Sequence, residues 1–300
     1  MDIRQPSPLM PGDAVGIAAP ASPFDRAAFE SGCRIVESLG FKPVFSEDVF
    51  ASHSFFAGSD RLRARLLNAF FAEPGIRGIW TVRGGYGFLR ILPLLDYSLI
   101  RANPKVIIGC SDISAGLNTI CRNCGISTVH GPMIASLANA DKATLASVIS
   151  LVSGGSLPVL EAAGPVIACG KAEGPVMGGN LTTLCHMLGT PYEPDFKGAV
   201  LFLEDIGEKP YRIDRMMFQM KLAGVLEKIV GVCLGTFVNC GELSSVYKIF
   251  ENTFKYTGVP VLAGFQAGHS FPNLSFPIGL SALLDTDAGT LTYTPTASGR

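Results

Sequence analysis

The segment from Val106 to Asp112, with the sequence V-I-I-G-C-S-D, joins a buried-type apolar run to residues that can do chemistry. The run ends at Gly109, and a helix-like segment follows Asp112 directly. This pattern is typical of a nucleophile elbow, where a tight strand-to-helix turn exposes one side chain at the carboxyl edge of a sheet. Ser111 is then the candidate nucleophile, and the N–H of Asp112 would favour an oxyanion near a helix N-terminus. The same local sequence equally allows Ser111 to be the N-cap of a helix that begins near Ser114.

A serine nucleophile needs a base within reach and a carboxylate that orients the base. The chain has four histidines. His269 lies in a loop too rich in glycine and proline to be a packing element, and His130 follows an apolar strand, so both remain candidates for the base. His53 is expected in a polar loop, and His186 is expected to be buried on an apolar helix.

The apolar run from Leu201 to Leu203 leads straight into Glu204 and Asp205. Acids at a strand end can be solvated boundary residues. A functional role requires Glu204 to point over the cleft towards His269. Both interpretations are open at this point.

The sequence Arg83-Gly84-Gly85-Tyr86-Gly87 follows a predicted strand and matches neither Walker A nor G-x-G-x-x-G. Glycines at a strand end let backbone N–H groups approach a substrate oxygen. Gly85 is therefore the expected second oxyanion donor beside Asp112. Arg83 could pair with a substrate carboxylate.

The eight cysteines are expected to be reduced and buried. Cys121 and Cys124 form a C-x-x-C, but no second pair follows at zinc-site spacing, so we interpret them as core residues and expect no metal site. Cys110 beside Ser111 is a competing nucleophile, since thiolates react faster than hydroxyls. Adjacent residues on a turn point in different directions, so only one can occupy its apex.

The chain has 300 residues, 48% hydrophobic and 16% charged residues, and a net charge of −1. Such a composition is typical of a globular α/β protein and gives no electrostatic signal for nucleic acid or an anionic membrane. The amino terminus lacks the apolar core of a signal peptide, and no apolar run approaches the roughly 20 residues that span a bilayer. We therefore expect a cytoplasmic protein.

The first half alternates short apolar runs with amphipathic stretches, which predicts a parallel sheet covered by helices. Sites in such sheets lie beyond the carboxyl ends of the strands. The expected strands are 14–19, 42–46, 76–82, 106–109 and 126–129, and the expected helices are 24–39 and 59–71, with Ser59 as the N-cap.

Dense glycine and proline from Val152 to Pro175 predict a linker with one short strand inside it. The expected domains are 1–151, carrying the nucleophile, and 176–300, carrying the acid and the base. In the second domain we expect strands at 199–203, 229–234, 259–263, 281–285 and 290–294, and helices at 180–188, 211–222 and 243–254.

These segments together resemble the LD-carboxypeptidase family, serine peptidases that include muramoyl-tetrapeptide carboxypeptidases and microcin C immunity proteins. The matching motifs run nearly from end to end of the chain. They are P-G-D-A-V-G-I-A-A-P-A-S-P (11–23), A-G-S-D-R-L-R (57–63), R-G-G-Y-G (83–87), I-G-C-S-D (108–112), H-G-P-M (130–133), G-G-N-L (178–181), L-E-D-I-G-E-K-P-Y-R-I-D-R (203–215) and G-H-S-F-P-N-L-S-F-P-I-G (268–279).

The resemblance implies a flavodoxin-like N-terminal domain and a smaller swivelling-type β/α C-terminal domain, with the active site between them. It implies a triad of Ser111, Glu204 and His269. The oxyanion hole would be formed by the N–H groups of Gly85 and Asp112.

The resemblance also implies a homodimer without metal or cofactor. Its substrate would be cytoplasmic murein tetrapeptide, which loses its terminal D-alanine. We assign substrate binding to Arg83, Tyr86 and Arg212. The position before the nucleophile is usually tyrosine in the family and is Cys110 here, a difference that we expect to alter the pocket wall.

Two other functions compete with this one. The microcin immunity branch of the family hydrolyses acyl-sulfamoyl adenylates and uses a longer insertion with an aromatic residue that stacks on adenine. This chain is compact, and its single tryptophan, Trp80, lies in a predicted strand, which favours the tetrapeptide. A non-catalytic binding protein of the same fold is disfavoured by the presence of all three triad residues.

Overall fold

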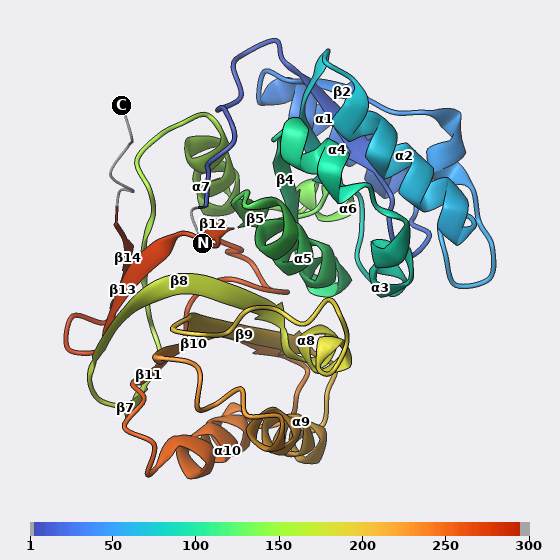
Figure 1. Ribbon diagram of the computed structural model, residues 1–300. Helices are drawn as coiled ribbons and strands as arrows, with labels where there is room; N and C mark the ends of the chain where they lie inside the picture. Colours follow the sequence, from blue (N-terminus) through green and yellow to red (C-terminus); the bar gives the residue numbers. More distant parts are fainter. Residues whose placement is uncertain (1–2, 295–300) are drawn as a thin grey trace.

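The computed structural model describes residues 3–294 and contains two β-sheets (Figure 1). The first sheet has six strands in the order β12-β5-β4-β3-β1-β2, and the second has eight in the order β6-β14-β13-β8-β9-β10-β11-β7. Figure 1 shows the first sheet and its helices packed against one side of the second sheet. The fold is α/β, as the sequence predicts.

The first sheet carries the flavodoxin-like order 2-1-3-4-5 in its parallel part. Apart from the exposed edge strand β2, the short strands of this part are almost entirely buried, which is why they read as apolar runs. One further strand, β12, pairs antiparallel with β5 at the edge. The strands are β1 (Ala14–Ala18), β2 (Lys42–Val44), β3 (Ile76–Thr81), β4 (Val106–Gly109), β5 (Thr128–His130) and β12 (Phe276–Ile278).

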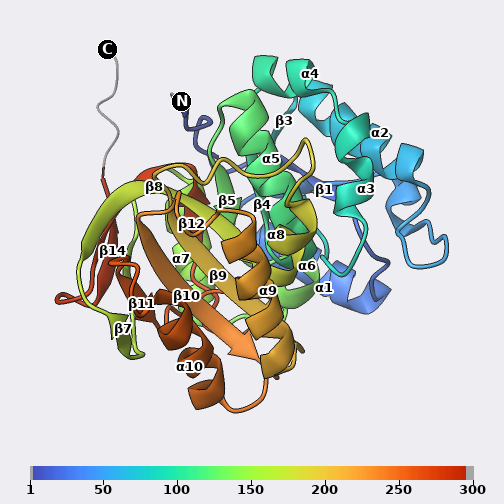
Figure 2. The same ribbon diagram turned by 60° about the horizontal axis from the view of Figure 1, so that its bottom comes forward.

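Helices cover both faces of this sheet (Figure 2). Ser59 caps α2 as predicted, because its Oγ accepts the N–H of Leu62 at 3.3 Å. Gly125, with φ +66°, ends α5 in the left-handed conformation. One face carries α1 (Arg26–Ser38), α6 (Ile134–Leu137) and α7 (Lys142–Val152), and the other carries α2 (Asp60–Ala72), α3 (Phe88–Ile91), α4 (Tyr97–Ala102) and α5 (Ser114–Cys124).

The second sheet is mixed. Its central strands β8 to β11 are parallel, and the flanking strands pair antiparallel. In Figure 1, α9 and α10 cover the side of this sheet that faces away from the first sheet. The elements are β6 (Val159–Glu161), β7 (Val166–Ala168), β8 (Lys171–Asn180), α8 (Leu181–Met187), β9 (Val200–Ile206), α9 (Pro210–Leu222), β10 (Gly231–Val238), α10 (Leu243–Phe254), β11 (Val261–Ala263), β13 (Ser281–Asp285) and β14 (Thr290–Tyr293).

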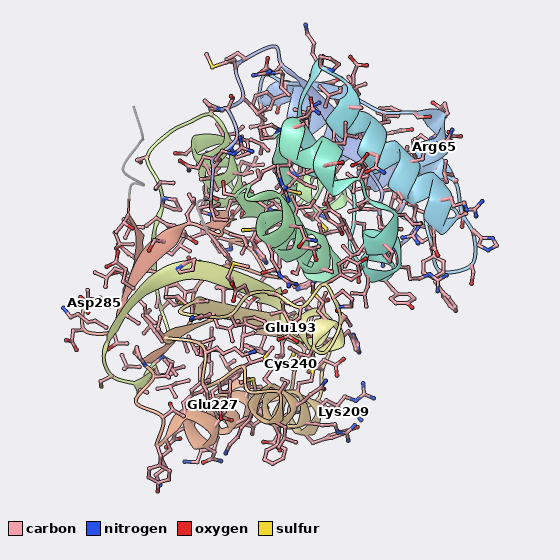
Figure 3. All side chains as sticks on the ribbon, in the orientation of Figure 1. Arg65, Glu193, Lys209, Glu227, Cys240 and Asp285 are labelled. Carbon is pink, nitrogen blue, oxygen red and sulfur yellow. The ribbon has the colours of Figure 1, made fainter. Side chains whose placement is uncertain are left out.

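The two halves share their apolar cores. One buried cluster runs from Leu67 on α2 and Ile120 on α5 to Leu184 on α8 and Met217 on α9. We call the contact of α5 and β12 with β8 and β9 the seam. Side chains from both halves fill the space between α5 and β8 in Figure 3.

Two expectations about the middle and the end of the chain are wrong. The segment expected to be a linker with one strand forms β6, β7 and the first residues of β8. Their backbone groups are paired in the second sheet, so the glycines and prolines mark turns between short strands. Strand β12 is also missed, although it completes the first sheet from the C-terminal half. No helix within residues 3–294 has both the length and the apolar character needed to cross a membrane.

Candidate active site

Ser111 lies at the apex of the turn between β4 and α5. Its φ is +61°, a left-handed conformation that is uncommon for any residue other than glycine. A 3₁₀ turn over Ser111–Ile113 follows, and the residue before α5 is Ile113, with no side-chain cap. The N-cap interpretation of Ser111 is therefore wrong. The serine is half-buried at the carboxyl end of β4, as the nucleophile-elbow pattern predicts.

Cys110 is turned away from this apex into the protein. Its side chain is buried, and burial together with the nearby charge of Glu204 raises the pKa of the Cys110 thiol far above its usual range. A thiol held neutral in this way is a poor nucleophile. Of the two adjacent candidates, only Ser111 is presented at the turn.

Glu204 and His269 meet at the seam. Glu204 Oε2 lies 2.6 Å from His269 Nδ1, with the carboxylate fully buried and the imidazole 15% exposed. Strand alternation explains the direction, since Glu204 shares a face of β9 with Phe202, whose ring packs 4.5 Å from that of Phe276 on β12. Glu204 therefore points towards the first sheet, which the functional interpretation of the acids required.

The charges in this pair favour a basic imidazole. Burial opposes the charged form of His269, but the hydrogen bond and negative charge of Glu204 outweigh it, so the pKa of His269 is raised above its usual value. Burial also raises the pKa of Glu204, against the lowering effect of His269. With Nδ1 bound to Glu204, Nε2 is the ring nitrogen left for a proton from a substrate or nucleophile.

Asp205, next to Glu204, has a different role. It points to the opposite face of β9 and accepts hydrogen bonds from Asn180 Nδ2 at 2.9 Å, and from the N–H and Oγ1 of Thr182 at 2.9 and 2.8 Å. The acid thus ties β9 to the start of α8. Because side chains alternate along β9, Glu204 contacts His269 and Asp205 stabilises the start of α8.

The loop that carries His269 is held by side chains from both halves. Thr236 Oγ1 on β10 accepts the N–H of His269 at 3.1 Å, and Asn273 Oδ1 accepts the N–H of Gly268 at 3.0 Å. The N–H of Asn273 in turn donates to Thr144 Oγ1 on α7 at 2.8 Å. A glycine- and proline-rich loop is thereby fixed without regular secondary structure.

The other three histidines form no ion pair with a carboxylate of residues 3–294. His130 is buried, its ring stacks 4.7 Å from that of Phe276, and burial lowers its pKa to about 3, with His269 adding to the effect. Within residues 3–294 neither of its ring nitrogens has a hydrogen-bond partner. His53 lies in an exposed loop as expected, whereas the expectation for His186 is wrong, because it is exposed on α8.

The glycine-rich turn from Arg83 to Gly87 packs directly against Ser111. A Cβ added to Gly84 would lie 2.8 Å from Ser111 Cβ and 3.1 Å from the nitrogen of Asp112. Within the described chain, the N–H groups of Gly85 and Asp112 donate no hydrogen bond. Asp112 follows Ser111 directly, and Gly85 follows the glycine that packs against Ser111, so both free N–H groups are candidate donors for an oxyanion hole.

The three residues assigned to substrate binding are only partly brought to this region. Arg83 and Tyr86 lie on the glycine-rich turn and are exposed, with Arg83 Nη1 donating to the carbonyl of Pro23 at 2.8 Å. Arg212 contacts Glu208 and Tyr211 on and near its own helix, and no hydrogen bond in the described chain joins it to Ser111, Glu204 or His269. Lys209, at the start of the same helix, lies on the outer side of the second half in Figure 3.

Seven of the eight cysteines are buried, including the C-x-x-C pair at the end of α5, but Cys169 is exposed. The expectation that all are buried is wrong at this position, which lies in the turn between β7 and β8. Residues 3–294 hold no cluster of three or more His, Cys, Asp or Glu side chains arranged for a metal ion.

Sequence reasoning gave no role to Ser22, Arg63 or Thr236, which hold the turn and the loop of the site. One signal was available for Arg63. It lies four residues before Leu67 and eight before Phe71, so helical spacing puts an arginine on the buried stripe of α2.

Comparison with known proteins agrees with the two-part architecture. Residues 15–131 match the model of the LD-carboxypeptidase N-terminal domain, and residues 173–284 match that of the C-terminal domain. A probable murein peptide carboxypeptidase of Bacillus subtilis is 36% identical over 292 residues, covering 94% of this chain and 92% of that protein. The murein tetrapeptide carboxypeptidase of Pseudomonas aeruginosa is 33% identical over 290 residues, covering 90% of this chain and 92% of that protein.

A solved structure of MccF in complex with glutamyl sulfamoyl guanosine has the same fold. It gives a TM-score of 0.89 at 26% identity and covers 97% of this chain and 98% of that chain. With both domain models matched and relatives above 30% identity along the whole chain, this protein belongs to the LD-carboxypeptidase family.

Proposed function

We propose that this protein is a serine LD-carboxypeptidase with a triad of Ser111, His269 and Glu204. The observation that carries the proposal is the 2.6 Å pairing of His269 Nδ1 with the buried Glu204. A carboxylate on Nδ1 fixes the tautomer in which Nε2 can accept a proton. No hydrogen bond joins Ser111 Oγ to His269 among the described residues, so we expect this contact to form when substrate binds.

In the proposed reaction Ser111 Oγ attacks the carbonyl carbon between an L-configured residue and a terminal D-amino acid, and its proton passes to His269 Nε2. The carbonyl oxygen becomes an oxyanion held by the N–H groups of Gly85 and Asp112. The C–N bond then breaks, and His269 returns the proton to the departing amine. Water hydrolyses the ester by the same two steps and restores Ser111.

We propose murein tetrapeptide as the substrate, with release of its terminal D-alanine. The names of the relatives from B. subtilis and P. aeruginosa support this choice, at 36% and 33% identity. Family resemblance further suggests a cytoplasmic homodimer of two-domain subunits. Light scattering on the purified protein measures the dimer directly, and a monomer mass at working concentration would contradict it.

The test compares two substrates and one variant. We expect the wild-type protein to release D-alanine from murein tetrapeptide, detected by mass spectrometry, and Ser111→Ala to lower the rate by at least about 10⁴-fold. Aspartyl sulfamoyl adenosine, a compound found in complex with MccF, is assayed in parallel. If the protein hydrolyses only this compound, the immunity function replaces the proposed one. If Ser111→Ala hydrolyses either substrate at the wild-type rate, the triad proposal is wrong.

A further inference from the structure

The glycine-rich turn from Arg83 to Gly87 has little in its own sequence to hold it in place. Gly85 and Gly87 have φ values of +90° and +129°, and the turn lies between β3 and the four-residue helix α3. Oxyanion donors lower a barrier only when they are already oriented before the reaction. A turn of this composition therefore depends on contacts from other parts of the chain.

Asp112 supplies one of these contacts with its side chain. Its buried carboxylate accepts the N–H of Phe88, the first residue of α3, at 2.8 Å. Burial raises the pKa of Asp112 to about 6, against the lowering effects of the Phe88 and Gly87 amides and of Arg63. The same residue presents its own backbone N–H beside Ser111.

Ser22 supplies a second contact from the loop after β1. Its Oγ accepts the N–H of Tyr86 at 2.9 Å, and its own N–H donates to the carbonyl of Gly84 at 3.1 Å. These bonds hold the residues on either side of Gly85. The N–H of Gly85 itself donates no hydrogen bond within residues 3–294.

Arg63 closes the far end of the turn. Its guanidinium is fully buried and donates to the carbonyl of Gly87 at 2.8 Å and to the carbonyl of Pro20. The turn is thus fixed by hydrogen bonds at Gly84, Tyr86, Gly87 and Phe88. The N–H of Gly85, which is the turn's proposed oxyanion donor, donates no hydrogen bond within residues 3–294.

We infer that Asp112 and Ser22 are positioning residues that set the separation of the two oxyanion donors. Residue 112 offers one donor from its backbone, and its carboxylate, with Ser22 opposite, holds the turn that offers the other. This inference rests on the proposed function, because it assigns a purpose to the oxyanion hole of that reaction. The expected effect lies in kcat, since an oxyanion exists only beyond the ground state.

The experiment uses Asp112→Ala, Asp112→Asn and Ser22→Ala, with Asp96→Ala as a matched control. Asp96 also accepts a backbone N–H at a helix start, that of Leu99 on α4, but does not touch the turn. We expect Asp112→Ala to lower kcat at least about tenfold and Ser22→Ala by a smaller factor, each with KM nearly unchanged. Asp112→Asn keeps an oxygen for Phe88 and should retain most of the activity, as should Asp96→Ala.

A second readout is the labelling of Ser111 by a fluorophosphonate. Ser111 Oγ forms a bond to phosphorus as its proton passes to His269 Nε2, the P–F bond breaks with release of fluoride, and the phosphoryl oxygen occupies the oxyanion position. The labelling rate should fall in Asp112→Ala and Ser22→Ala and recover in Asp112→Asn. A loss in Asp112→Asn as large as in Asp112→Ala, or wild-type rates in both alanine variants, would overturn the inference. If Asp112→Ala does not fold, a wild-type labelling rate in Ser22→Ala is by itself enough to overturn the inference.

Failure of the inference differs from failure of the proposed function. If the wild-type protein is labelled at Ser111 and hydrolyses the tetrapeptide while the variants match it, the triad stands and only the positioning role is wrong. If the wild-type protein is not labelled at Ser111, the proposed mechanism itself is wrong.

Discussion

The turn that carries Ser111 and the loop that carries His269 lie on opposite sides of the seam, and they are held in different ways. Ser111 depends on backbone shape, with φ +61° at the serine and a glycine turn packed against it. His269 depends on side chains, through Glu204 at 2.6 Å and Thr236 at 3.1 Å. The nucleophile side is therefore sensitive to added volume, and the base side to lost charge and lost hydrogen bonds.

The largest effect is expected on the base side, from Glu204→Gln. The amide keeps the volume of the buried carboxylate but removes its charge and does not hold the imidazole in the required tautomer, so kcat should fall by about 10⁴-fold. Steady-state kinetics against Glu251→Gln, a surface change on α10, measure the effect. A loss below tenfold would mean that Glu204 does not orient the base.

The pH profile sharpens the same prediction. The base must be neutral, so activity falls as pH drops through the pKa of His269, which the charge of Glu204 raises above its usual value. Glu204→Gln removes that charge and leaves burial, which lowers the pKa. The acid limb of kcat/KM should therefore move to lower pH in the variant, and an unmoved limb would assign it to another group.

On the nucleophile side, Gly84→Ala tests sensitivity to volume. The new Cβ would lie 2.8 Å from Ser111 Cβ, closer than real contacts allow, so the turn or the serine must shift. We expect kcat to fall by about 10- to 100-fold, because misplacement of about 1 Å costs on this scale. Gly75→Ala, in the loop before β3, is the control, and equal activity in both variants would show that the turn can yield freely.

The smallest effect is expected from Thr236→Val, which removes the acceptor for the N–H of His269 without changing the size of the side chain. Loss of one such bond corresponds to about 1 kcal/mol, or less than tenfold in kcat. Thr236→Ser should restore the rate. Thr257→Val removes a similar acceptor, for the N–H of Val259, away from the site, and should leave kcat unchanged.

The sequence predicts the turn that carries Ser111 better than it predicts the pairing of Glu204 with His269. Gly109 and Ser111 stand at the end of an apolar run, so the elbow follows from local pattern alone. The pairing of Glu204 with His269 crosses 65 residues, and the residues alone favoured His269 but left His130 as a second candidate. The choice between the two histidines depends on where Glu204 points from β9 and on the contacts that hold the His269 loop.

The errors have a common physical cause. Strands β6, β7 and β12 are three residues long, and their partners lie far away in the chain, so no periodicity can reveal them. His186 stands in an apolar helix, but the one side of α8 that faces solvent is set by packing against α5 and α9. Local composition identifies the helix and not its exposed face.

The position of β12 in the chain has a consequence for folding during synthesis. It begins seven residues after His269 and forms the edge of the sheet that holds Ser111, so this sheet is completed only after the strands β6 to β11 of the other sheet have been synthesised. A nascent chain that stops before Phe276 leaves β5 with an open edge. Cutting the chain between its two halves would remove β12 from the first sheet, whereas all eight strands of the second sheet would stay on one piece of chain.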